Sequence, residues 1–274
     1  MPGVDDGAQS LQEALALCRL AVADGTQVAV ATPHARGRGG VWTEHLAPAP
    51  GPRGAGPNGP QPEAAGITAA QVEAWTSALQ RELDAQGIPL RLVAGMETLF
   101  DADLPSRAPS LVTLGGTRYL LLEFPAWMVP PGAAEVIFRL QAAGLVPVIA
   151  HPERNDEIAR RPELLEELVQ RGCLVQVTAM SLTGGFGSAA HATATALLQA
   201  GLAHVIASDA HSYPWRPTGL SEAVAEAARV VGEAQARAMV TSIPRAILEN
   251  REVAVRPPSP ARRRRRPRRF WSIW

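Results

Sequence analysis

Residues with oxygen or nitrogen donors follow a series of short apolar runs in this chain of 274 residues. The donors are three histidines, two glutamates and one aspartate: His34, Glu97, Glu123, His151, Asp209 and His211. If the runs are strands of a parallel β/α fold, their carboxyl ends lie on one face, so we expect these side chains to meet in one pocket. A mixed set of imidazole and carboxylate ligands without thiolates suits Mn²⁺, Fe²⁺ or Zn²⁺ and differs from a structural zinc site.

Each of these residues taken alone has an ordinary explanation, as a solvated loop residue or as a core or surface histidine. The context His151-Pro152-Glu153-Arg154-Asn155 favours a functional role, and so does the position of Asp209 and His211 directly after an apolar run. The joint pattern favours a site more strongly than any member does. The remaining histidines are predicted to be structural or solvent-facing: His45, His191 and His204.

Two arginines accompany the predicted ligands, since Arg154 lies three residues after His151 and Arg216 five residues after His211. A planar guanidinium group binds phosphate oxygens and stabilises the charge that develops in a phosphoryl-transfer transition state. Ordinary surface arginines are the alternative, because all 26 basic residues of the chain are arginine. The pattern predicts a metal-dependent phosphoester hydrolase in which activated water attacks phosphorus without a covalent enzyme intermediate.

The two cysteines argue against a thiol-based phosphatase, in which an arginine follows the nucleophilic cysteine by six positions. The sixth residue after Cys18 is Asp24, and the sixth after Cys173 is Ala179. Both cysteines fall at apolar positions of helix or strand patterns, so we predict reduced thiols in the core.

The apolar runs belong to a recurring unit in which a helix ends at a glycine and a strand follows. The helix-ending glycines are predicted at Gly25, Gly87, Gly144, Gly172 and Gly201. Two capping boxes are predicted at helix starts, Ser10 with Glu13 and Thr68 with Gln71. The predicted strands are 27–32, 90–94, 119–124, 146–150, 174–178 and 204–208. Strands that alternate with helices and are apolar on both faces predict a parallel sheet, either a barrel or doubly wound.

Composition predicts one domain with two segments outside its core. Apolar residues make up 46% of the chain, enough for a sizeable core, and the formal net charge is zero. A cluster of arginines near the end balances an acidic body, which suits a cation site better than a nucleic-acid surface. We predict a domain at 1–250, with a disordered Pro- and Gly-rich insertion at 47–66 and a disordered Arg-rich tail at 251–274.

The tail and the start of the chain bear on localisation. The tail places arginines beside Phe270, Trp271 and Trp274, a combination that can contact anionic membrane at its surface. The sequence shows neither a signal peptide nor an apolar run of membrane-spanning length, so we expect a cytoplasmic protein.

Five motifs at the residues described above carry a resemblance to a known family. They are Pro2-Gly3-Val4-Asp5-Asp6-Gly7-Ala8, Ala31-Thr32-Pro33-His34, Leu122-Glu123-Phe124-Pro125, Ala150-His151-Pro152-Glu153-Arg154-Asn155 and Ala207-Ser208-Asp209-Ala210-His211. From Met1 to about Asn250, outside the insertion, the chain resembles the CpsB-type bacterial tyrosine-protein phosphatases of the polymerase-and-histidinol-phosphatase (PHP) superfamily. The resemblance implies a distorted (β/α)7 barrel and a multinuclear cluster of divalent metals, usually manganese. It also implies an enzyme of capsular and exopolysaccharide biosynthesis that dephosphorylates a bacterial tyrosine kinase. A nucleic-acid partner is not expected, because the body of the chain is acidic.

Residue by residue, the resemblance also implies a set of metal ligands and a phosphate site. The implied ligands are Asp6, His34, Glu97, Glu123, His151, Asp209 and His211, and the implied phosphate-binding residues are Arg154 and Arg216. The family opens with a strand that carries a His-x-His pair shortly before Asp-Asp-Gly, whereas Met1 falls inside that gap. We therefore expect a barrel that lacks its first strand. Two alternatives stay open: a PHP phosphoesterase acting on a small phosphomonoester such as histidinol phosphate or on a nucleic-acid end, and an inactive truncated form.

Overall fold

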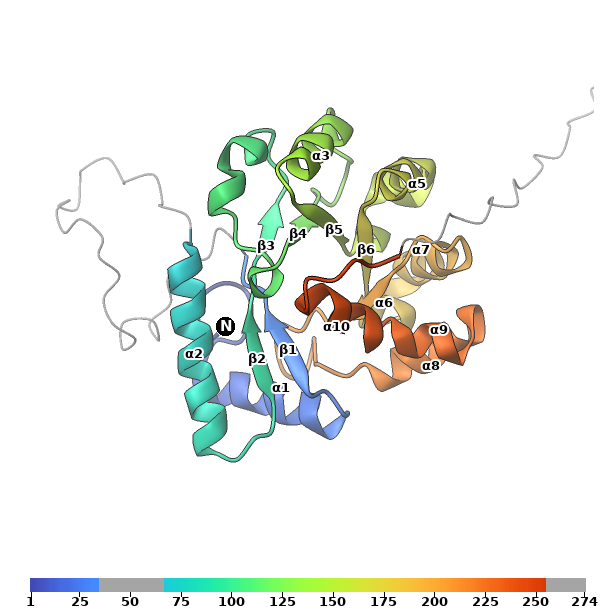
Figure 1. Ribbon diagram of the computed structural model, residues 1–274. Helices are drawn as coiled ribbons and strands as arrows, with labels where there is room; N and C mark the ends of the chain where they lie inside the picture. Colours follow the sequence, from blue (N-terminus) through green and yellow to red (C-terminus); the bar gives the residue numbers. More distant parts are fainter. Residues whose placement is uncertain (35–66, 255–274) are drawn as a thin grey trace, which may run out of the picture.

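Seven parallel strands form two sheets in the computed structural model, which describes residues 1–34 and 67–254 (Figure 1). The two-stranded sheet pairs β1 (Val28–Ala31) with β2 (Arg91–Ala94). The five-stranded sheet runs in chain order through β3 (Glu97–Leu99), β4 (Tyr119–Glu123), β5 (Val146–Ala150), β6 (Leu174–Thr178) and β7 (Val205–Ala207). An α/β fold with parallel strands, as predicted, is confirmed.

Helices surround the strands on the outside of the molecule (Figure 1). They are α1 (Leu11–Ala23), α2 (Ala69–Ala85), α3 (Ala133–Ala142), α4 (Asp156–Arg160), α5 (Glu163–Gln170), α6 (Ala179–Leu182), α7 (Gly187–Gln199), α8 (Ser221–Val231), α9 (Glu233–Ala238) and α10 (Ser242–Leu248). Three short 3₁₀ turns, at Leu104–Ser110, Leu114–Gly116 and Pro152–Arg154, complete the described elements. No helix in the described part of the chain is both long and apolar enough to cross a membrane.

The repeating helix–glycine–strand unit accounts for this order. Every glycine predicted to end a helix has a positive φ, for example 92° at Gly25 and 71° at Gly201, a backbone conformation that glycine adopts without steric cost. The capping box of Thr68 and Gln71 is present in full. At Ser10 only half of the predicted box forms, because the Glu13 carboxylate accepts a hydrogen bond from the backbone N–H of Gln9 and not from that of Ser10.

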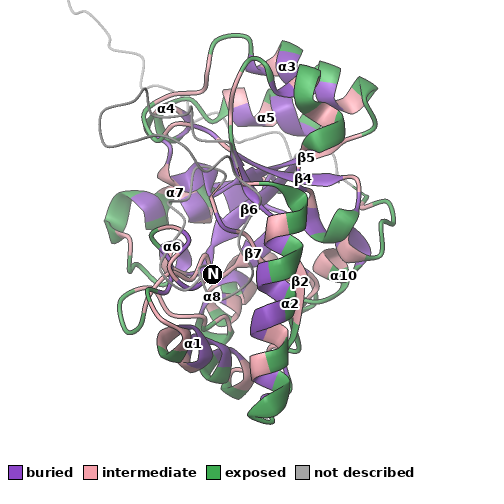
Figure 2. Ribbon diagram, turned by 90° about the vertical axis from the view of Figure 1, so that its left-hand side faces the viewer, coloured by how far each residue is buried: buried purple, intermediate pink, exposed green. Residues whose placement is uncertain are grey.

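Alternate residues of β4 face two different apolar clusters. Leu120 and Leu122 pack in the larger cluster, between the five-stranded sheet and helices such as α3, α5 and α7. Tyr119 and Leu121 pack in a second cluster, with Val148 among others. The central strands are buried while the outer faces of the helices are exposed (Figure 2). Burial on both faces explains why these strands are continuous apolar runs in the sequence.

The segment from β2 to β3 joins the two sheets, and its course differs from the prediction. The backbone of Gly95 donates to Ala31, and that of Glu97 donates to Pro33, so this segment stays beside the β1 strand while β3 begins to pair with β4. The predicted strand at 90–94 therefore continues, after a break at Gly95, as a strand that we did not predict.

The described strands do not form the one closed sheet that the barrel predicted from the resemblance would have. Within residues 1–34 and 67–254 the strands form the two sheets described above, and a single isolated bridge, between His34 and Glu97, connects β1 to the larger sheet. The strand is interrupted at Gly95 and Met96, between β2 and β3, although Glu97 still donates to Pro33. The predicted loss of a first strand stays a prediction. The predicted insertion at 47–66 and the tail from residue 255 lie outside the described residues.

Candidate metal centre

The seven predicted metal ligands come from the strand ends and from the turn that precedes α1. Glu97 opens β3, Glu123 ends β4, and His151 follows β5 directly. His34 lies three residues after β1, while Asp209 and His211 lie in the loop after β7. Asp6 belongs to the N-terminal turn. Because the strands are parallel, their carboxyl ends bring residues distant in sequence onto one face, and Glu97 joins them from the junction of β2 and β3.

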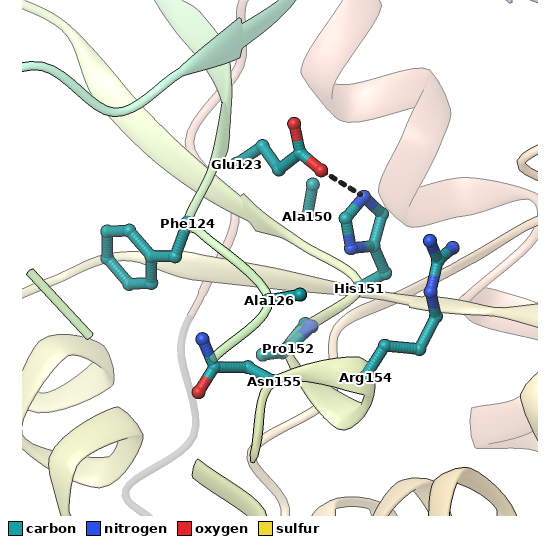
Figure 3. Close-up of a pocket in the computed structure, with 8 residues that line it drawn as sticks. All are labelled: Glu123, Phe124, Ala126, Ala150, His151, Pro152, Arg154 and Asn155. Carbon is teal, nitrogen blue, oxygen red and sulfur yellow. Dashed lines mark ion pairs between the residues drawn. The ribbon is translucent and has the colours of Figure 1, made fainter. Parts of the chain in front are cut away.

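Glu97, Glu123 and His151 form the more buried of two ligand groups, in which one donor atom from each residue lies within 4.8 Å of the others. The His151 Nε2 atom lies 2.7 Å from Oε1 of Glu97 and 3.6 Å from Oε1 of Glu123. Figure 3 shows Glu123 and His151 pointing toward one another beside a small pocket. Two carboxylates and one imidazole at this spacing are a donor set that fits a divalent cation.

The pKa values of this group reflect crowding of like charges in a buried place. Burial raises the pKa of Glu123, and the neighbouring carboxylate of Glu97 raises it further. Burial alone would lower the pKa of His151, but the hydrogen bond and the negative charge of Glu97 outweigh burial and raise it. Both shifts reflect negative charge crowded in this group, which a bound metal cation would compensate.

Asp6, His34 and His211 form the second group, again with one donor atom each within 4.8 Å of the others. The Oδ1 atom of Asp6 lies 3.4 Å from Nε2 of His34 and 3.5 Å from Nε2 of His211. This group is more open to solvent, since the Asp6 side chain is 65% exposed. The carboxylate of Asp5 accepts from the backbone N–H of His34 at 2.9 Å and from that of Gly7 at 3.0 Å, so it fixes the turn that presents Asp6.

The two groups adjoin, and Asp209 lies next to them. His34 Nδ1 is 3.8 Å from Oε2 of Glu97, which connects one group to the other. Asp209 belongs to neither group, although its Oδ1 atom lies 3.6 Å from Nδ1 of His211. The structure therefore brings six predicted ligands into two groups and places the seventh beside them.

Both predicted arginines reach the same carboxylate oxygen. Nη1 of Arg154 and Nη2 of Arg216 each donate to Oδ2 of Asp209 at 2.6 Å. The Asp209 side chain is 8% exposed, so these charge-assisted hydrogen bonds are shielded from water. The buried Nε of Arg216 has no hydrogen-bond partner among the described residues. Each guanidinium group has five N–H donors and gives one of them to Asp209, so donors remain for an anion beside the ligand groups.

Comparison with known proteins identifies the family. The family described as "Capsular polysaccharide synthesis, CpsB/CapC" matches residues 60–249. This chain belongs to the CpsB/CapC family.

Relatives with names and structures support the assignment. The tyrosine-protein phosphatase YwqE of Bacillus subtilis (strain 168) is 34% identical over 269 residues, which cover 97% of this chain and 95% of YwqE. The putative tyrosine-protein phosphatase CapC of Staphylococcus aureus is 31% identical, over 80% of this chain and 77% of CapC. A crystal structure from the pair YwqE of Bacillus subtilis and CpsB of Streptococcus pneumoniae, named as unique metal-dependent tyrosine phosphatases, matches with a TM-score of 0.82 at 31% identity over 96% of both chains. The predicted membership of a family of metal-dependent tyrosine phosphatases in capsular polysaccharide synthesis is confirmed.

Two buried residues that sequence reasoning missed hold the family's His-Pro-Glu-Arg-Asn segment from both sides. Oε1 of Glu153 accepts from the backbone N–H of Thr178 at 2.9 Å and from the hydroxyl of Ser181 at 2.7 Å, which ties the segment to β6 and α6. The Asn155 amide donates to the carbonyls of Pro125 and Met128 at 2.7 and 2.9 Å, which ties it to the loop after β4. Arg154 lies between these two anchors.

Two of the predicted ligands adopt a left-handed backbone that residues other than glycine rarely adopt. The φ angle is 31° at His151 and 50° at Asp209. Such a conformation costs on the order of 1–3 kcal/mol and persists where surrounding contacts enforce it. Each of these two residues lies within two positions of the end of a strand and is itself a predicted ligand.

The remaining predictions on histidine and cysteine can be compared with the structure. Nδ1 of His191 lies 2.9 Å from the carbonyl of Leu182, and Nδ1 of the buried His204 accepts from the backbone N–H of Val175, so both are structural as predicted. His45 lies outside the described residues. Cys18 and Cys173 are free and buried, as predicted, and burial raises the pKa of the Cys173 thiol to about 12, which excludes it as a thiolate nucleophile at neutral pH.

Proposed function

We propose that this metal-dependent tyrosine-protein phosphatase of the CpsB/CapC family hydrolyses phosphotyrosine on a bacterial tyrosine kinase that controls capsular or exopolysaccharide assembly. The observation that carries the proposal is the junction of two N/O ligand groups through His34 and Glu97, with Arg154 and Arg216 converging beside them. The names of YwqE and CapC support the substrate class.

The donor set fits divalent metals, and we propose Mn²⁺. Imidazole nitrogens and carboxylate oxygens without thiolates suit Mn²⁺, Fe²⁺ or Zn²⁺. The residues that would hold the metals are Glu97, Glu123 and His151 in one group and Asp6, His34 and His211 in the other, with Asp209 as a further ligand. Bound there, such metals supply a water of lowered pKa and neutralise phosphoryl oxygens.

The protein's own residues bind and orient the phosphoryl group. Arg154 and Arg216 approach from two different loops, and their planar N–H edges suit two non-bridging oxygens. Asp209 holds both guanidinium groups at one point, so little reorganisation is needed when charge develops. The phenolate that leaves from phosphotyrosine is a moderately good leaving group, because the pKa of tyrosine is about 10.

The test compares substrates and metals on the same protein. Turnover of a phosphotyrosine peptide should exceed turnover of histidinol phosphate, should disappear after exhaustive treatment with EDTA, and should return when Mn²⁺ is added. Preference for histidinol phosphate would favour the small phosphomonoester alternative, and full activity after chelation would contradict the metal centre.

For the tail we propose a contact with anionic membrane, which would raise the local concentration of phosphatase near a membrane-bound kinase. Arginines beside Phe270, Trp271 and Trp274 support this proposal, since a basic residue near an anionic surface contributes about 1 kcal/mol. Co-sedimentation with anionic liposomes should be stronger for the whole chain than for a chain ending at Asn250. Equal sedimentation would remove the proposal.

A further inference from the structure

Both arginines of the site share one aromatic ring as well as one carboxylate. The Cζ atom of Arg154 lies over the ring of Phe186 at 4.7 Å from its centroid, and Cζ of Arg216 lies at 5.5 Å. Both guanidinium groups also donate to Oδ2 of Asp209. Phe186 lies in the loop between α6 and α7, whereas Arg154 follows β5 and Arg216 follows β7, so three separate segments meet at this ring.

The ring of Phe186 has no other evident structural role. It is half-buried and belongs to none of the apolar clusters found among the described residues. Its loop is held in place from the other side, because Glu153 binds Thr178 and Ser181 at the start of α6. The loop itself turns at Gly184 and Gly187, whose φ angles are 84° and 87°. The ring is therefore presented to the arginines by an anchored turn.

An aromatic ring can hold two arginines together in a way that the carboxylate of Asp209 alone cannot. Two guanidinium groups at one carboxylate oxygen repel each other, and every N–H that binds Asp209 is unavailable to a phosphoryl group. An aromatic face attracts a cation through its quadrupole and stacks on the guanidinium plane, so it uses none of the N–H donors at the edge of that plane. The ring can thus hold both cations while leaving their donors to the substrate.

We propose that Phe186 is a positioning residue of the phosphatase reaction, which holds Arg154 and Arg216 as a pair for two oxygens of the phosphoryl group. This proposal rests on the proposed function of the two arginines. It assigns the π face of the ring, and not its apolar volume, as the property that matters.

The experiment separates these two properties. Phe186→Leu retains an apolar side chain but removes the π face, whereas Phe186→Tyr retains the face. With Mn²⁺ present we expect kcat/KM for a phosphotyrosine peptide to fall about tenfold in Phe186→Leu and to stay within about threefold of the parent in Phe186→Tyr. Phe138→Leu is the matched control, because Phe138 is a 58% exposed phenylalanine on α3 and should leave kcat/KM unchanged.

Binding of inorganic phosphate, measured by calorimetry, tests the same role without turnover. Its Kd should weaken in Phe186→Leu and not in Phe186→Tyr. If the parent binds phosphate in this pattern but does not hydrolyse phosphotyrosine, the proposed substrate fails while the role of Phe186 stands. Parent-like kcat/KM and phosphate Kd in Phe186→Leu would overturn the proposal. Equal losses in Phe186→Leu and Phe186→Tyr would also overturn it, since they would assign the effect to shape.

A double variant measures whether the effects of two substitutions on kcat/KM are coupled, which a general loss of structure would not produce. If Phe186 acts through the arginines, Phe186→Leu should cost less in kcat/KM when Arg154 is already alanine than in the parent. Independent, additive effects of the two substitutions would contradict the coupling. Thermal unfolding of each variant, monitored by circular dichroism, identifies any variant whose fold has changed.

Discussion

At the scale of single residues, Arg154 is the side chain whose chemistry can be measured most directly. It lies beside the ligand groups but belongs to neither, so its removal should leave the metal content unchanged. Loss of a donor to charge that develops in the transition state costs about 10²-fold or more in kcat. We expect this loss for Arg154→Ala, measured by kinetics with metal analysis on the same sample.

The control is Arg160→Ala, since Arg160 is exposed at the end of α4 in the same stretch of chain. A kcat within about threefold of the parent for Arg154→Ala, equivalent to roughly 0.65 kcal/mol, would show that Arg154 is an ordinary surface residue.

His204 should make the free energy of unfolding depend on pH. Burial lowers the pKa of His204 to about 4, against 6.5 for an unperturbed histidine. Between these values the unfolded chain binds a proton that the folded chain does not, so stability present at pH 6.5 is lost as the pH falls toward 4, by up to about 1.4 kcal/mol per pH unit. Urea unfolding at pH 6.5 and 4.5 measures this slope.

His204→Asn can keep an acceptor for the backbone N–H of Val175 but cannot take up the proton. Its stability should therefore fall less steeply than that of the parent over the same range of pH. Identical slopes for the two proteins would contradict the assigned pKa.

The sequence predicted residues of the site whose type carries a signal by itself. Histidine and carboxylate after an apolar run point to a metal, and the structure brings five such residues into two groups. The sixth grouped residue, Asp6, was predicted only from the family resemblance. Asp5, Glu153, Asn155 and Phe186 were missed because their roles depend on partners remote in sequence, such as Thr178 for Glu153. Only the fold brings those partners together, so a single sequence has no pattern that could indicate them.

At the scale of elements, Gly95 controls how β2 passes into β3. A Cβ atom at this position would lie 2.7 Å from Cγ1 of Val30 and 3.2 Å from Cδ2 of Leu114. Gly95→Ala should therefore lower the free energy of unfolding by about 1–3 kcal/mol, the usual cost of overpacking. It should also weaken the metal centre, because Glu97 lies two residues further on.

Gly219→Ala is the matched control, since a Cβ atom there would meet nothing within 4 Å. Denaturant unfolding compares the two variants with the parent. Equal stability of Gly95→Ala and Gly219→Ala would show that the side chains of Val30 and Leu114 can give way at this point without cost.

The helix–glycine–strand repeat made six of the strands predictable, because each strand is an apolar run that follows or precedes a recognisable helix. The strand β3 escaped prediction for a physical reason. It has three residues and begins with Glu97, so it has neither the length nor the pattern of a strand. Its register comes from β4 on one side and from the end of β1 on the other, which are contacts that local sequence does not encode.

At the scale of the whole molecule, the site concentrates negative charge on one face of the strands. Four carboxylates, those of Asp6, Glu97, Glu123 and Asp209, lie among the predicted ligands. Binding of a divalent cation to the folded state alone should stabilise it, by about 2.7 kcal/mol when the free metal is a hundredfold above its Kd. We expect Mn²⁺ to raise the melting temperature by about 5–10 °C in differential scanning calorimetry, since about 1 kcal/mol corresponds to roughly 2–4 °C at this size.

Glu97→Gln should reduce this shift, because Glu97 contacts both ligand groups. Glu222→Gln, an exposed carboxylate in the first turn of α8, should leave the shift as it is in the parent. The same shift in all three proteins would place the bound metal somewhere other than in the two groups.

At His151 and Asp209 the left-handed backbone favours one type of residue and the proposed chemistry requires another. Glycine would relax each turn, and asparagine would tolerate it, yet neither can supply an imidazole or a carboxylate. At these two positions the residue that suits the turn best is not the residue that suits the reaction. If all variants were ranked by cellular abundance, glycine or asparagine at these positions would therefore rank above the parent residue. If the same variants were ranked by phosphatase activity, these substitutions would be among the most damaging. Substitutions on which the two rankings disagree mark positions where the protein keeps a less stable backbone because the reaction needs the side chain.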